Sequence, residues 1–227
     1  MKRILLALTV LLSVQLADAQ VKAPEAAKKA VDAAEAASKD AKKATKVATW
    51  LKLATAYMDA YNAPKGSAWI GASKQELQLV MGSEKPVSSE QVVLGGEPCM
   101  KEVYADKEIY FNQNGQVIMI YVTKPIYENA LSQALEAYKK AYEVDVKKSK
   151  EKDITAGIQS ITQNLMDDGM SSYMFEDYAT ASRLFGQAVE ASATAPLSQV
   201  DTISLYNAAF TAWMVKDYAR AEEYFNK

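Results

Sequence analysis

Residues 177–185 read DYATASRLF, and residues 217–225 read DYARAEEYF. Asp, Tyr, Ala and Phe keep the same spacing in both stretches. Recurrence of one pattern after about 40 residues is typical of arrays of stacked helical units. The two stretches therefore predict a mainly α-helical chain assembled from repeated helix pairs.

A related pattern opens the first pair, where residues 50–57 read WLKLATAY. Trp50, Leu53 and Tyr57 fall at i, i+3 and i+7, so they share one face of a helix. Ala54 is small enough for a second helix to approach closely at that position. These residues predict the first helix of the first pair, over residues 47–62.

The second helix of this first pair does not follow at once. Residues 62–66 (NAPKG) end the first helix, and the small–aromatic–small spacing of a partner helix returns only at Ala134, Tyr138 and Ala141. The first pair is thus predicted to consist of residues 47–62 and 126–146, split by an insertion over 63–125. Insertions of this kind map to loops and often lie on a functional side of the array.

The insertion has the pattern of a small α+β unit. Residues 73–76 (SKQE) form a capping box for a short helix that Gly82 can end. Asn114-Gly115 is a strong hairpin signal. Residues 117–122 are apolar on both faces, which indicates a central strand or one packed on the helices. We expect a three- or four-stranded antiparallel sheet from strand-like runs at residues 91–94, 99–104, 107–112 and 116–123.

An Ala/Lys-rich segment, residues 20–46, precedes the first pair. Pro24 and Glu25 suit a helix start, and Val31 is nearly its only large apolar residue. We expect a lead-in helix that covers the first pair, with a flexible spacer as the alternative. The later helices are expected at residues 154–173, 175–191 and 200–215, and the last stretch begins at 217.

Together the stretches at 50–57, 177–185 and 217–225 resemble the tetratricopeptide repeat family, of the exported Gram-negative type with no assigned role. HEAT-like arrays have similar periods but lack the Asp-Tyr-x2-Ala-x3-Phe spacing. The resemblance implies a helical-hairpin solenoid with these parts: signal peptide 1–19, lead-in helix 20–46, split first repeat 47–62 and 126–146, α+β insertion 63–125, second repeat 154–192 and truncated third repeat 199–227.

The same resemblance implies a concave groove, lined by the first helix of each repeat, that binds a protein or peptide. The groove positions are Leu51, Thr55 and Met58 in the first repeat; Met166, Met170, Tyr173 and Met174 in the second; and Tyr206, Phe210, Trp213 and Met214 in the third. Met and aromatic side chains adapt to varied partners and dominate interface energies. The alternative is that this stripe packs inside the molecule, against the insertion.

Composition argues against most enzyme classes. The chain has no His, and Cys99 is its single cysteine, so histidine-based catalysis and a thiolate zinc site are excluded. Asp167 and Asp168 are adjacent, point about 100° apart on a helix and are expected on a solvated face. With 26 basic and 28 acidic residues, a nucleic-acid-binding face is not indicated. We expect no cofactor, no metal and no enzymatic activity.

The N-terminus reads as an export signal. Lys2 and Arg3 precede an apolar run at residues 4–14, and residues 17–19 (ADA) form a cleavage site that leaves Gln20 first. No other apolar stretch is long enough to cross a bilayer, so no membrane insertion of the mature chain is expected. The expected location is the periplasm, with the extracellular space as the alternative.

Two hypotheses for function follow. The first is an exported, non-enzymatic scaffold that binds a protein or peptide in the groove. The second is an adaptor whose β insertion binds a peptide or glycan through exposed aromatics at Trp69, Tyr104 and Tyr110. The alternative for these three side chains is that they form the insertion's own small core. Because the last repeat would leave Ile203, Phe210 and Tyr224 partly uncovered, we also expect a longer native chain or self-association through that end.

Overall fold

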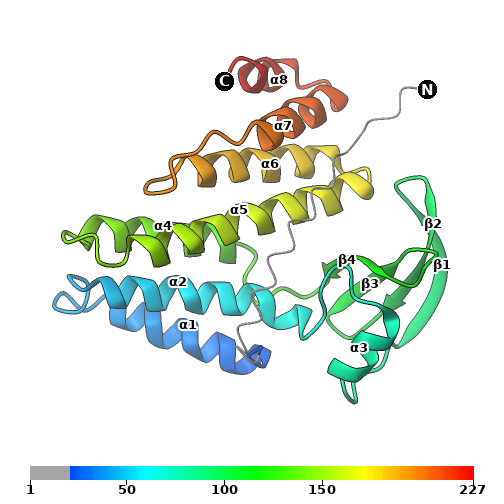
Figure 1. The fold of residues 1–227 in the computed structure, drawn as a ribbon, viewed down its shortest axis with the longest axis horizontal. Helices are drawn as coiled ribbons and strands as arrows, with labels where there is room; N and C mark the ends of the chain where they lie inside the picture. Colours follow the sequence, from blue (N-terminus) through cyan, green and yellow to red (C-terminus); the bar gives the residue numbers. More distant parts are fainter. Residues whose placement is uncertain (1–20) are drawn as a thin grey trace.

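The computed structural model describes residues 21–227 and shows a mainly helical protein with a small antiparallel sheet (Figure 1). The predicted signal peptide, residues 1–19, lies outside the described residues. Within them lie eight α-helices: α1 Pro24–Ser38, α2 Val47–Asn62, α3 Lys74–Val80, α4 Ala130–Val144, α5 Glu151–Met174, α6 Tyr178–Ala193, α7 Thr202–Met214 and α8 Tyr218–Phe225.

Except for α3, which belongs to the insertion, each helix packs against the next along the chain, from α1 to α8 (Figure 1). Ala134 and Ala141 are fully buried between α2 and its neighbours, and Tyr138 is almost fully buried. The small–aromatic–small spacing at these three positions therefore marks the buried face of α4, as the sequence indicated.

The lead-in segment is a helix that packs on α2. Ala27, Val31 and Ala34 form its buried stripe, so the alternative of a flexible spacer is wrong. The helix ends at Ser38, earlier than the expected segment, because the Asp40 carboxylate accepts hydrogen bonds from the backbone N–H groups of Lys42 and Lys43. This arrangement closes a turn before α2.

The recurring Asp residues are N-caps. The Asp177 carboxylate accepts a hydrogen bond from the Thr180 N–H (3.1 Å), and Asp217 accepts one from the Arg220 N–H (3.2 Å). Helix α6 consequently begins at Tyr178 and not at residue 175 as expected. The same spacing buries Phe185 but leaves Phe225 57% exposed.

The insertion after α2 holds the sheet. A short 3₁₀ helix η1 (Ala63–Lys65) leads to α3 and then to four strands in the order β1-β2-β3-β4, each antiparallel to the next. The strands are β1 Ser88–Leu94, β2 Glu97–Val103, β3 Lys107–Phe111 and β4 Val117–Val122. The capping box of α3 is present, with Ser73 Oγ accepting from the Glu76 N–H. The expected antiparallel sheet and its Asn114-Gly115 hairpin are confirmed.

Strand β4 is an edge strand, so the expectation of a central position is wrong. Its two apolar faces have separate partners. Val117 packs with Leu77 of α3 on one face of the sheet, and Met119 packs with Tyr110 and Met174 on the other. The sheet thus lies between α3 and the C-terminal end of α5, and the other half of that expectation, packing on helices, is confirmed.

Candidate binding surface

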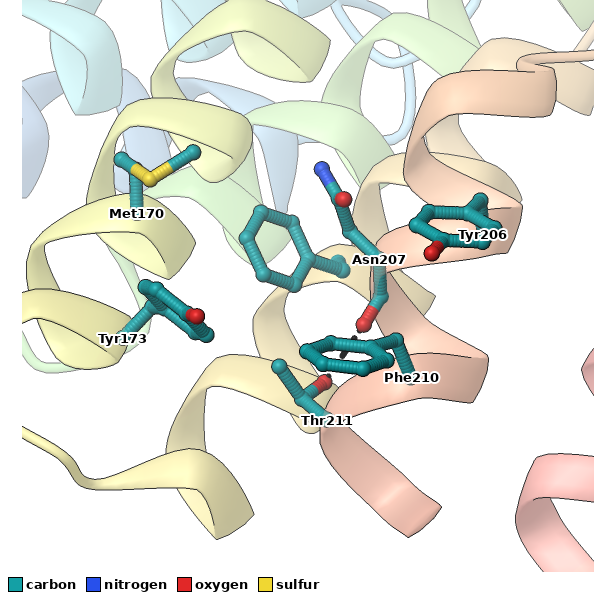
Figure 2. Close-up of a pocket in the computed structure, with 7 residues that line it drawn as sticks. Met170, Tyr173, Tyr206, Asn207, Phe210 and Thr211 are labelled. Carbon is teal, nitrogen blue, oxygen red and sulfur yellow. Dashed lines mark hydrogen bonds between the residues drawn. The ribbon is translucent and has the colours of Figure 1, made fainter. Parts of the chain in front are cut away.

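A shallow cavity of about 20 Å³ opens where α5, α6 and α7 meet (Figure 2). It is almost entirely apolar. Helix α5 contributes two of its side chains, α6 one and α7 four. The lining residues are Met170, Tyr173, Phe185, Tyr206, Asn207, Phe210 and Thr211.

A row of aromatic rings on α7 extends from this cavity. The Tyr206 and Phe210 ring centroids lie 6.1 Å apart with an interplanar angle of 6°, and those of Phe210 and Trp213 lie 6.2 Å apart at 26°. Positions i, i+4 and i+7 share a helix face, which explains the row. Tyr206 is 52% exposed and Trp213 56%. We refer to Met170, Tyr173, Tyr206, Asn207, Phe210 and Trp213 as the α5–α7 surface.

The floor of the cavity is held by a close approach of α5 to α6. A β-carbon added at Gly169 would lie 2.8 Å from Phe185 Cε1. Such contacts are too short for ordinary packing, so only glycine lets the Phe185 ring lie flat against α5.

Two polar side chains belong to the cavity. Thr211 Oγ1 donates a hydrogen bond to the Asn207 carbonyl oxygen at 2.6 Å (dashed in Figure 2). The Asn207 side-chain amide makes no hydrogen bond to any residue in 21–227. The residue is half-buried, and its amide offers two donors and one acceptor that no described residue uses.

The structure brings five of the eight candidate residues of the second and third repeats together: Met170, Tyr173, Tyr206 and Phe210 around the cavity, and Trp213 beside it. The other three lie apart. Met166 packs on the core formed by α1, α2, α4 and α5, and Met214 is half-buried outside the cavity. Met174 packs on the sheet, as the alternative of internal packing proposed.

The candidates from the first repeat do not extend this surface. Met58 is buried in the helical core, so its assignment to an open groove is wrong. Leu51 is partly buried against the same core, and only Thr55 is exposed. The inward-pointing side chains of α2 are buried against α1 and α4, so they do not line an open groove.

Sequence reasoning missed Phe185, Asn207 and Thr211 as lining residues. A signal for Asn207 was present, because it follows Tyr206 directly and precedes Phe210 by three positions, which places it on the same side of α7. The role of Phe185 depends on the distance between α5 and α6, which no local pattern gives.

A second cluster of polar groups joins α2 and α5. Tyr61 Oη donates a hydrogen bond to Asp168 Oδ1 at 2.8 Å, and the Lys65 ammonium lies 3.9 Å from the Tyr61 ring centroid. Burial raises the pKa of the Asp168 carboxyl, against the opposing effects of Lys65 and Tyr61, and burial lowers the pKa of Lys65. The expectation that Asp167 and Asp168 lie on a solvated face is therefore wrong: both are half-buried.

The aromatics of the insertion divide into two groups. Trp69 is 44% exposed, next to exposed Ile70. Tyr104 and Tyr110 are buried in the two sheet cores, and their hydroxyls donate to Glu102 (2.9 Å) and Glu108 (2.6 Å). The alternative, that these aromatics form the insertion's own small core, therefore holds for Tyr104 and Tyr110, and the exposure that glycan or peptide binding requires is found only at Trp69.

A wider, polar hollow of about 230 Å³ lies between the start of α1, η1 and the end of α3. The buried Lys107 ammonium lies there, 2.5 Å from Glu84 and 3.3 Å from Asp106, so its charge is already neutralised. Among residues 21–227, no group of three ligating side chains is placed to hold a metal ion. No helix in the described part is long and apolar enough to cross a membrane.

Comparison of the chain with family models, with curated proteins and with solved structures finds no match.

Proposed function

We propose that this protein is an exported, non-enzymatic interaction protein that binds an extended segment of a partner polypeptide at the α5–α7 surface. The observation that carries the proposal is the convergence of four Met and aromatic side chains from α5 and α7 on one shallow cavity, with Trp213 beside it and the Asn207 amide free to bond. Aromatic residues of this kind dominate the energetics of protein interfaces.

The size of the cavity supports a macromolecular partner over a small molecule. Pockets for small ligands enclose roughly 300–1,000 Å³, whereas this cavity holds about 20 Å³. It is sufficient to anchor the tip of one apolar side chain. The exposed faces of Tyr206 and Trp213 would then cover the neighbouring residues of the bound segment.

The polar group of the surface also fits a peptide. An amide side chain offers one acceptor and two donors, which match the N–H and C=O of a peptide unit. Asn207 follows Tyr206 on α7, and its side chain lies beside that of Tyr206 (Figure 2). A chain that crosses the rings would place its backbone within reach of this amide.

We further propose that the pairs α2/α4, α5/α6 and α7/α8 are tetratricopeptide repeats of a solenoid, with the first pair split by the insertion. Support comes from the N-cap Asp residues, the buried Ala181 and Ala221 at equivalent positions, and the close approach at Gly169. Residues 1–19 support export to the periplasm, with the extracellular space as the alternative.

The alternative function, binding of a peptide or glycan by the insertion, is favoured by one observation. Trp69 and Ile70 are adjacent and both largely exposed, on the loop between η1 and α3. A flat aromatic side chain there suits a sugar ring or an extended chain.

A peptide-selection experiment separates the two functions. A phage-displayed random peptide library is selected on the purified protein, and the dissociation constant of a fluorescein-labelled selected peptide is measured by polarisation. We expect Trp213→Ala and Tyr206→Ala each to weaken binding by about tenfold or more, since central aromatic anchors contribute about 2 kcal/mol.

The matched control is Leu79→Ala, which removes an exposed apolar side chain from α3 and should leave the dissociation constant unchanged. Loss of binding in Trp69→Ala with retention in Trp213→Ala would move the site to the insertion. Failure to enrich any peptide, or retention in all four variants, would contradict both functions.

A further inference from the structure

Within residues 21–227, no strand covers the outer edge of the sheet, along β1. Strand β1 pairs with β2 through all seven of its residues, and no strand among residues 21–227 pairs with its other side. Its first four residues are exposed, as is Val93, which is 72% exposed. An edge strand of this kind presents a row of unpaired backbone N–H and C=O groups.

The opposite edge of the sheet, along β4, is partly covered. At the start of β4, the backbone of residues 71–73 covers the strand's first residue: the Val117 N–H donates to the Ala72 carbonyl, and the Gly71 N–H donates to the Val117 carbonyl, both at 2.8 Å. In the described part of the chain, no backbone segment bonds to the outer side of β1 in this way. It also lacks the Lys, Pro and bulge that commonly protect free edges.

The turn between β1 and β2 fixes which groups face outward. Gly95 and Gly96 both have positive φ (58° and 84°), which gives a two-residue turn that closes on Leu94 and Glu97 as a hydrogen-bonded pair. Such pairs recur at every second residue of an antiparallel ladder. The backbone groups of Leu94, Val92 and Glu90 therefore face β2, and those of Ser89, Gln91 and Val93 face the solvent.

These outward groups are symmetric about Gln91. We propose that β1 pairs antiparallel with β1 of a second copy of this chain, across a two-fold axis at Gln91, so that two sheets join into one. In that register Gln91 faces Gln91 of the second copy, and Ser89 faces Val93. Each of these pairs has its N–H and C=O groups aimed at its counterpart, as an antiparallel hydrogen-bonded pair requires.

Side chains agree with the same register. Glu90, the single charge on β1, faces Val92 of the second copy, so no like charges oppose each other. Glu90 is already bound to Lys101 at 2.6 Å within its own sheet. The exposed Val93 gains a neighbour in Ser89 of the second copy. An interface in which each copy uses the same patch is the commonest arrangement of homodimers.

The interface is narrow, because a single strand pair buries less than the roughly 1,200 Å² of a stable complex. We therefore expect a reversible dimer whose fraction rises with protein concentration. Sedimentation velocity of the wild-type chain over a hundredfold range of concentration should show this rise. A monomer at every concentration overturns the proposal.

Substitution of Gln91 tests the edge itself. Gln91→Pro removes one outward N–H and keeps the inward ladder at Glu90 and Val92, because proline is tolerated at edge positions whose N–H faces solvent. We expect this variant to stay monomeric, with wild-type circular dichroism and a similar unfolding midpoint. Gln91→Thr keeps the N–H and should dimerise as the wild type does. If Gln91→Pro loses the fold, Val93→Lys is used in its place. It puts a charge on the exposed edge of β1 and should also keep the protein monomeric.

Crosslinking tests the register. Gln91→Cys places two thiols directly across the axis, and a short bismaleimide should join them; the natural Cys99 is buried. Leu79→Cys, exposed on α3, is the control and should not crosslink. A dimer that persists in Gln91→Pro or fails to crosslink through Gln91→Cys overturns the proposal. Loss of the dimer in Phe225→Ala, with Gln91→Pro unaffected, would assign self-association to the α7–α8 end.

Discussion

The pKa of the Asp168 carboxyl is shifted by burial and by the groups around it. Its carboxylate accepts the Tyr61 hydrogen bond at 2.8 Å, and Asp167, Lys65 and Tyr61 are the titratable groups around it. Burial is the largest cause of its raised pKa. A carboxylate held in this way is less stable as an anion than it is in the unfolded chain.

Stability should therefore depend on pH through Asp168. The folded pKa lies above the unfolded value of about 3.9, so the folded protein binds more protons between the two values and the free energy of unfolding falls as pH rises through that window. Asp168→Asn cannot titrate but still accepts from Tyr61. We expect it to lose less stability than the wild type between pH 4 and pH 7, measured by urea unfolding at several pH values.

The control for this prediction is Gln159→Ala, which changes an exposed side chain on the same helix and removes no titratable group. It should follow the wild-type dependence on pH. Equal slopes for Asp168→Asn and the wild type would show that burial of Asp168 does not contribute.

At the residue scale, the recurrence of Asp177 and Asp217 was visible in the sequence, but their role as N-caps was not predicted. The capping box of Ser73 and Glu76 was predicted, because its bonds join residues three apart. Asp168 was misjudged for the opposite reason. Its burial depends on Tyr61, which approaches only after α2 and α5 are packed.

At the scale of elements, the main link between the sheet and the later helices is the end of α5. Phe175 makes edge-to-face contacts with Tyr110 and Tyr121, with ring centroids 5.8 and 5.0 Å apart, and Met174 lies against Gly95. These side chains follow directly after Tyr173 of the α5–α7 surface. The side chains that hold the sheet against α5 are therefore direct neighbours, in sequence, of a residue proposed to bind the partner.

Phe175→Ala should weaken this link. Each aromatic pair contributes about 0.5–1.5 kcal/mol beyond the area it buries, so we expect a loss of about 2 kcal/mol in the free energy of unfolding. Hydrogen exchange should accelerate in β3 and β4 more than in α2 or α4. Tyr218→Ala removes a more exposed ring and serves as the control; uniform acceleration throughout the molecule would contradict a local docking role.

Elements were predicted better than their arrangement. All four strand runs were identified to within a few residues, since alternation and turn residues are local signals. The position of β4 was predicted wrongly, because a strand apolar on both faces can be central in a sheet or covered by helices on either side. Only the placement of α3 and Met174 distinguishes the two.

For the whole molecule, the sequence predicted a mainly helical chain with an antiparallel insertion, and the structure agrees. The residues of the α5–α7 surface were predicted in part. Helical spacing gave the face of α7, whereas Met58, Met166 and Met174 were assigned to the groove without knowledge of the segments that cover them. Tyr224, expected to be partly uncovered, is buried, while Ile203 is 53% exposed.

Export remains a prediction for the whole chain. Cleavage after Ala19 should leave Gln20 at the N-terminus of protein recovered from the periplasm, as intact mass would show. Ala17→Leu together with Ala19→Leu should leave the longer chain, because the cleavage site requires small residues. A mature protein that retains residues 1–19 in the wild type would contradict the signal.

The insertion also separates two helices that must meet. Helices α2 and α4 pack together although residues 63–129 lie between them, whereas α5 and α6 are joined by residues 175–177 alone. Closing the longer loop costs about 3 kcal/mol more in chain entropy if the insertion is still unstructured. We therefore expect the α5–α6 hairpin to form early in folding, and the first helix pair to assemble once the sheet has drawn its two ends together.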